Sequence, residues 1–130
     1  MARAYAIRRR VFIEEQHVPE EIELDDDDAH AFHALATLGG DAIGCGRMLD
    51  HGGDEVKIGR MAVMLQFRGT GVGRDLLRFL MDRARARGLR KAVLHAQLTA
   101  EGFYLKEGFT PLGDVFDEAG IAHRKMEKLL

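Results

Sequence analysis

Three alternating glycines, Gly69, Gly71 and Gly73, stand between a short apolar run and a long helical pattern. Glycine allows positive φ angles and a close approach of the backbone to a ligand, and the first N–H groups of a helix have no partner within it. These donors, the positive end of the helix dipole and the flanking Arg68 and Arg74 suit a phosphate or pyrophosphate. The stretch therefore predicts an anion site.

Generic phosphate loops do not fit this spacing. A P-loop needs a Gly-Lys-Ser/Thr ending, which is missing here, so ATP hydrolysis is not expected. A dinucleotide fingerprint needs a third glycine where this chain has Arg74, and no βαβ unit precedes it. What remains is the pattern Gln-x-x-Gly-x-Gly, formed by Gln66, Gly69 and Gly71.

Length and composition limit what the chain can be. Its 130 residues suit one domain, and its formal net charge of −2 argues against a nucleic-acid partner that needs a strongly basic field. We find neither an apolar run near the ~20 residues that cross a bilayer nor a signal peptide, so we expect no membrane partner and a cytoplasmic location. The single Cys45 agrees with a reducing compartment and reads as a small buried residue rather than a nucleophile.

Hydrophobic periodicity predicts the elements that position the glycine loop. They are a helix over 2–16, a hairpin with strands 31–38 and 42–49, a strand over 56–64, a helix ending before Gly88, a strand over 91–97, a short helix over 99–106, and a hairpin with strands 109–116 and 121–128. Gly44 and Gly46 indicate a bulge or a close ligand approach. The acidic segment 20–28 is interpreted as a solvated loop or short helix, or else as a lining for the entrance of a cationic amine.

This order of elements and several motifs resemble the GNAT superfamily of N-acetyltransferases, in particular a branch of small bacterial proteins of largely unassigned substrate. The motifs are the Gln66 to Gly71 pattern, Ile58 to Val63, Gly102 to Phe109, Arg10 to Gln16, and Ala119 to His123. The resemblance implies a single α/β (α+β) domain over 1–130, with a mixed, mainly antiparallel sheet flanked by helices. The family usually begins with a β-strand, whereas this chain starts almost directly in the first helix, so either that strand is absent or the sequence begins after it. If it is absent, the open edge can be covered by a second subunit in a homodimer.

The resemblance implies transfer of acetyl from acetyl-CoA to a primary amine of a small molecule or amino acid, by direct attack with both substrates bound. The pyrophosphate would lie on Arg68, Gly69, Thr70, Gly71, Val72, Gly73 and Arg74; the alternative is a tight turn with two exposed arginines. The backbone of Met61, Ala62 and Val63 would bind the pantetheine arm and polarise the acetyl carbonyl. The resemblance implies Gln97 and Phe103 as further cofactor contacts.

Tyr104 matches the family tyrosine that protonates the leaving thiolate, a role that suits a phenol with an ordinary pKa of ~10. Half-buried packing is the alternative for this side chain. The family's central-strand glutamate has no counterpart in 56–60, with Glu55 just before it. The base therefore stays open among a water chain and the candidates Glu14, Glu15, Asp28, His33 and His95.

Arg47 and Arg60 lie on neighbouring predicted strands, so they could meet and bind a substrate carboxylate, or they could be separate surface arginines. No metal is expected, because His30 and His33 would face opposite ways in a strand. Two other functions stay open. One is a non-catalytic acyl-CoA-binding module, and the other is acetylation of protein lysines or N-termini.

Overall fold

The computed structural model describes residues 2–20 and 25–130, and every predicted helix and strand is present in it. The main elements are α1 (Ala2–Arg8), β1 (Phe32–Leu38), β2 (Asp41–Gly52), β3 (Glu55–Val63), α3 (Val72–Ala86), β4 (Lys91–Gln97), α4 (Glu101–Lys106), β5 (Thr110–Glu118) and β6 (Ile121–Leu129). The short ones are η1 (Arg9–Glu15), η2 (Asp26–Ala29), η3 (Leu65–Phe67) and η4 (Leu98–Ala100).

Within the described residues the strands form one six-stranded sheet in the order β1-β2-β3-β4-β6-β5. Neighbouring strands are antiparallel except β3 and β4, which are parallel and joined by the crossover through α3. A parallel pair needs such a crossover, because a tight turn can only join antiparallel strands. The predicted mixed, mainly antiparallel sheet is confirmed.

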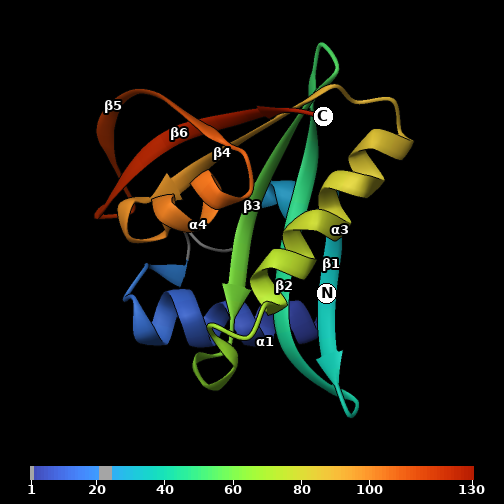
Figure 1. Cartoon of the computed structure of the whole chain (residues 1–130). Helices are drawn as coiled ribbons and strands as arrows, with labels where there is room; N and C mark the ends of the chain where they lie inside the picture. Colours follow the sequence, from blue (N-terminus) through green and yellow to red (C-terminus); the bar gives the residue numbers. More distant parts are fainter. Residues whose placement is uncertain (1, 21–24) are drawn as a thin grey trace.

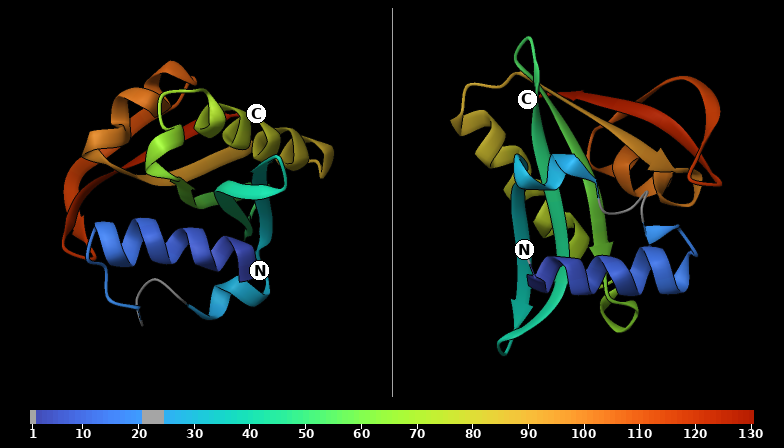
Figure 2. Two further views of the ribbon diagram at one scale, coloured as in Figure 1. Left: turned by 90° about the horizontal axis from the view of Figure 1, so that it is seen from below. Right: turned by 180° about the vertical axis from the view of Figure 1, so that it is seen from behind.

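Helices cover both faces of the sheet (Figure 1), with α3 and α4 on one face and α1 on the other, as Figure 2 shows from below. The apolar stripe of α3 packs on the first face. Its buried members are Leu76, Leu77, Leu80, Met81 and Ala84, which join Ile58, Leu94 and Met126 in the larger core. On the other face, Ala4 and Ile7 of α1 pack against Cys45 and Ala62 in a smaller core.

Gly44 and Gly46 of β2 allow α3 to approach the sheet closely. A Cβ atom added at Gly44 would lie 2.9 Å from Leu76 Cδ1, and one at Gly46 would lie 2.5 Å from Met61 Sδ and 3.0 Å from Leu80 Cδ1. The predicted bulge is present here as a register shift between β2 and β3. The close approach comes from α3 and Met61.

The predicted helix over 2–16 is α-helical only in its first half. Residues Arg9–Glu15 form a π-helix, and the N–H of Gln16 donates to the carbonyl of Val11, five residues back, at 3.1 Å. Periodicity cannot separate the two helix types over so few residues. Across the described residues we find no helix with the length and apolar character that a bilayer crossing requires.

Candidate active site

The parallel strands β3 and β4 separate in the middle of the sheet. Their ladder runs only from Glu55 with Lys91 to Lys57 with Val93, and the later residues of the two strands are not paired with each other. Figure 1 shows the two strands diverging toward their carboxyl ends, beside α4 and the start of α3. The sheet therefore opens between two strands that carry predicted cofactor contacts, Met61 to Val63 on β3 and Gln97 on β4.

A bulge in β3 borders this opening. Arg47 of β2 pairs with Gly59 and Cys45 pairs with Ala62, so the single Gly46 faces two residues, Arg60 and Met61. Arg60 has a φ of 51°, a left-handed conformation that is rare outside glycine. A bulge places one residue outside the regular ladder, and this one lies in the stretch where the pantetheine arm was predicted.

The glycine loop has the conformation that an anion cradle needs. Gly69 has a φ of 79°, and Gly71, the N-cap of α3, has a φ of 93°. The first bond into α3 is donated by the N–H of Asp75 to the carbonyl of Gly71, at 3.0 Å. The N–H groups at 72–74 precede that bond at the positive end of the helix, so they suit a pyrophosphate.

Gly73 brings three of the predicted cofactor contacts together. A Cβ atom added there would lie 3.7 Å from Phe103 Cζ of α4 and 3.7 Å from Val63 Cγ2 of β3. The end of β3, the first turn of α3 and the short helix α4 therefore meet at one point. Of these segments, α4 is distant from the other two in the sequence, and the fold brings it beside them.

Tyr104 lies directly after Phe103 and is 8% exposed, in the larger core. Its ring packs edge-on against Phe103 at 5.0 Å and Phe109 at 5.8 Å between centroids. Burial raises the pKa of the Tyr104 phenol to about 12, so the hydroxyl keeps its proton at neutral pH. A protonated phenol beside the cofactor contacts can serve as an acid.

A domain family described as "Acetyltransferase (GNAT) domain" matches residues 3–130. This chain belongs to the GNAT acetyltransferase family. It is therefore an N-acetyltransferase of that family.

Relatives in this family match almost the whole chain. The uncharacterised N-acetyltransferase YjcF of Bacillus subtilis is 35% identical over 128 residues, covering 96% of this chain and 89% of YjcF. Escherichia coli ElaA has a TM-score of 0.86 at 27% identity, covering 98% of this chain and 88% of ElaA. An acyl-CoA N-acyltransferase from Pseudomonas aeruginosa has a TM-score of 0.81 at 27% identity, with coverages of 98% and 88%. The predicted GNAT fold is confirmed.

Two predicted cofactor contacts of this GNAT domain bind other side chains of the same chain. Arg68 donates through both terminal nitrogens to Glu15, at 2.8 Å each, and through Nε to the carbonyl of Val63 at 2.9 Å. Gln97, at the open end of β4, exchanges side-chain bonds with Gln16, the shorter at 2.9 Å. The contacts of Arg68 with Glu15 and of Gln97 with Gln16 connect these two predicted cofactor contacts to the segment that follows α1.

The predicted substrate pair, Arg47 and Arg60, meets around carboxylates of its own chain. Arg47 binds Asp25 at 2.7 Å and Asp28 at 2.8 Å, and Arg60 binds Asp25 at 3.1 Å. Asp28 also binds Arg8 at 2.7 Å, and Arg8 is only 1% exposed. Burial of a guanidinium group needs such a partner.

This cluster of Arg8, Asp25, Asp28, Arg47 and Arg60 bears on two expectations. A substrate carboxylate at Arg47 would have to displace Asp25 and Asp28, so we leave the two arginines out of the proposed site. In the described end of the acidic segment, the short helix is present as η2, with Asp26 and Asp27 exposed, while Asp25 and Asp28 bind arginines; residues 21–24 lie outside the described residues. Nothing in the local sequence identifies which arginines these aspartates bind.

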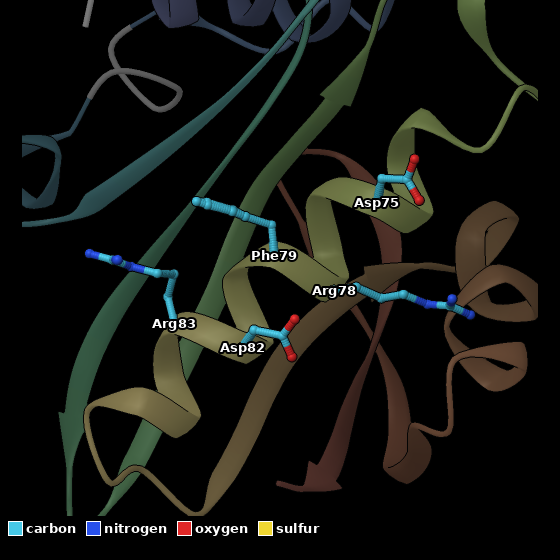
Figure 3. A pocket seen from close by; sticks show the side chains of 5 residues that line it. All are labelled: Asp75, Arg78, Phe79, Asp82 and Arg83. Atoms are coloured by element: carbon cyan, nitrogen blue, oxygen red, sulfur yellow. The ribbon is translucent and has the colours of Figure 1, made fainter.

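The outer face of α3 carries an open hollow of about 370 Å³ (Figure 3). It is lined by Asp75, Arg78, Phe79, Asp82 and Arg83. Arg78 points toward α4 and binds Glu107 at 2.8 Å, while Phe79 packs edge-on against Phe32. These side chains contact one another or their neighbours, so we assign no ligand to the hollow. Among the described residues we find no His, Cys, Asp and Glu group that could hold a metal ion.

Proposed function

We propose that this GNAT protein transfers an acetyl group from acetyl-CoA to a primary amine of a small molecule or amino acid. The amine attacks the thioester directly, with both substrates bound at the opening between β3 and β4. This proposal rests on one observation: the side chains of Val63 and Phe103 both lie next to Gly73, at the start of α3. A ligand that joins a pyrophosphate to a narrow flexible arm matches a helix N-terminus placed next to a split in a sheet.

Each part of the cofactor has a group suited to it. The pyrophosphate would accept hydrogen bonds from the backbone of the glycine loop, with charge supplied by Arg68 and Arg74. The pantetheine arm would lie along Met61, Ala62 and Val63, beside the bulge in β3, and their backbone would polarise the acetyl carbonyl. The description of the Pseudomonas relative as an acyl-CoA N-acyltransferase supports an acyl-CoA donor.

Tyr104 would protonate the sulfur of coenzyme A as the carbon–sulfur bond breaks. Its raised pKa keeps the proton available, and its neighbours Phe103 and Phe109 hold the ring in one orientation. Arg68 would reach the pyrophosphate from the loop, where its Nε donates to the carbonyl of Val63. Gln97 would contact the arm from the opposite strand.

A calorimetric titration with acetyl-CoA tests the cofactor, with ATP and NADP as controls for other pyrophosphate ligands. We expect acetyl-CoA to bind selectively. Thiol release is then followed with putrescine, 2-phenylethylamine, glutamate and lysine as acceptors. Equal binding of all three nucleotides would contradict the proposal. Selective acetyl-CoA binding without thiol release would instead support an acyl-CoA-binding role, and release only with a lysine-containing peptide would support protein acetylation.

A further inference from the structure

A histidine, a glutamate and a second histidine lie together on the strands beyond the opening. His95 of β4 bonds through Nδ1 to Glu118 Oε1 of β5 at 2.9 Å, and His123 Nε2 of β6 lies 3.6 Å from Glu118 Oε2. The ring of Phe116 packs edge-on against His95 at 5.0 Å and stacks on His123 at 6.0 Å. These contacts hold both imidazoles and the carboxylate in one arrangement.

His95 occupies a particular place on β4. The ladder with β3 ends at Val93, and side chains alternate along a strand, so His95 is the next residue on that face beyond the ladder. Two residues further along the same face, Gln97 bonds to Gln16 of the segment after α1. Ala92, Leu94 and Ala96 pack in the core with α3, so His95 lies on the sheet face away from α3, just past the end of the ladder with β3.

The hydrogen bond to Glu118 sets the tautomer of His95. Burial alone would raise the pKa of Glu118. The hydrogen bond from His95 and the electrostatic attraction of His95, His123 and Lys57 outweigh burial and lower this pKa, so Glu118 is a carboxylate at neutral pH. A carboxylate only accepts, so Nδ1 of His95 carries the hydrogen and Nε2 of the neutral ring has a lone pair. The side chain of His95 is 29% exposed, and no described residue bonds Nε2.

The other candidate bases are engaged or lack an orienting partner. The bond from Arg68 lowers the pKa of Glu15 and makes it a weaker base, and Asp28 binds two buried arginines. His33 Nε2 bonds to the carbonyl of Asp28 at 2.9 Å. Glu14 is exposed, and among the described residues no group orients it.

We propose that His95 is the general base of the transfer, and that Glu118 is the positioning residue that orients it. This inference rests on the proposed function. The amine nitrogen bonds to the acetyl carbon while its proton passes to Nε2 of His95, and the carbon–sulfur bond breaks while sulfur takes the proton of Tyr104. His95 then releases its proton to water, and Tyr104 regains one from water. The sum is amine plus acetyl-CoA giving amide plus free thiol.

The charged and titratable groups that face His95 come from three strands. They are Lys57 of β3, Glu118 of β5, and His123 and Lys125 of β6, with Lys125 directly opposite His95 in the ladder. Protonation of His95 removes the lone pair, so kcat/KM should fall on the acid side of its profile.

The test compares His95→Ala, His95→Gln and Glu118→Gln with the control His51→Gln, an exposed histidine of β2. Each folded variant is titrated with acetyl-CoA and assayed for thiol release with the best acceptor among the four amines. We expect both His95 variants to lose about 100-fold in kcat while the acetyl-CoA Kd stays the same. We also expect free imidazole to restore part of the His95→Ala rate, and Glu118→Gln to shift the acid limb of the profile.

The outcomes separate this inference from the function on which it rests. Wild-type kcat and pH profile in both His95 variants would overturn the role of His95 and leave the acetyltransferase proposal standing. A loss of rate without imidazole rescue and with an unchanged acid limb would show a structural role and also overturn it. If the unmodified protein bound acetyl-CoA but acetylated none of the amines, the proposed function and the base assignment would fall together.

Discussion

Arg68 of the glycine loop and Glu15 of η1 form a two-bond ion pair, with both terminal nitrogens 2.8 Å from a carboxylate oxygen. The pair joins the proposed pyrophosphate site to the segment that follows α1. The same Arg68 donates through Nε to the carbonyl of Val63, so its side chain stays beside the loop even without Glu15. Glu15 therefore places a negative charge close to where a pyrophosphate would lie.

Replacement of Glu15 should strengthen acetyl-CoA binding. In Glu15→Gln the charge of Arg68 is no longer neutralised, so we expect a Kd several-fold lower at low salt, with the gain reduced by added salt. Arg68→Gln should raise the Kd by about tenfold, the effect of one lost charge-assisted contact. Glu14→Gln, an adjacent exposed carboxylate, is the control and should leave the Kd unchanged. A higher Kd for Glu15→Gln would mean that Glu15 orients Arg68 for the cofactor.

Gly71→Val should prevent acetyl-CoA binding. Gly71 has a φ of 93°, and an added Cβ would lie 2.9 Å from the Arg74 guanidinium, so the loop must change shape. Gly53→Val in the β2–β3 turn is the matched control, because Gly53 also has a positive φ, 59°, but no atom lies within 4 Å of an added Cβ. Calorimetry on folded samples should show binding only in the control. Normal binding by Gly71→Val would contradict the anion cradle.

Tyr104→Phe should slow turnover and spare binding. The substitution removes the hydroxyl while the aromatic packing with Phe103 and Phe109 remains, so the Kd for acetyl-CoA should be unchanged. Thiol release should fall by about 100-fold, the usual contribution of a proton donor. Because the pKa of Tyr104 is about 12, the wild-type rate should show no loss from its ionisation between neutral pH and pH 10. An unchanged kcat in the variant would exclude Tyr104 as the acid.

Asp28→Asn should destabilise the fold strongly. It leaves the buried Arg8 and Arg47 with one carboxylate fewer, which should cost about 3 kcal/mol in urea unfolding. Asp26→Asn, in the same short helix but exposed, is the control and should stay within about 0.5 kcal/mol of wild type. A loss below about 1 kcal/mol for Asp28→Asn would show that the cluster adds little.

The same carboxylates predict an acid-side loss of stability. The bond from Arg47 lowers the pKa of Asp25, and the arginine contacts of Asp28 outweigh its burial and lower its pKa as well. A lowered pKa stabilises the fold fully above the unfolded value of 3.8, and this contribution disappears as pH falls below it through the folded values. Urea midpoints measured between pH 6 and pH 2 should therefore fall more steeply in wild type than in Asp28→Asn.

Local chemistry let the sequence predict the elements and the glycine loop. Helix and strand periodicity, and glycines at positions that need a positive φ, depend on neighbours in the chain, so Gly69, Gly71 and the boundaries of α3 could be inferred without a structure. Burial of Cys45 followed from its apolar strand and is confirmed at 1% exposure. The mixed, mainly antiparallel sheet was predicted from the GNAT motifs, because members of one family share the order of their elements.

Partners of charged side chains were decided only by the tertiary structure. Glu15 and Arg68 are 53 positions apart, and His95 and Glu118 are 23 apart, so no local pattern pairs them. An arginine or an aspartate can take many partners, and the choice depends on which strands become neighbours and where β3 and β4 separate. The sequence by itself therefore predicted the family, the elements and the positive φ angles of Gly69 and Gly71. Only the fold decided that Arg47 binds Asp25 and Asp28, and that His95 bonds to Glu118.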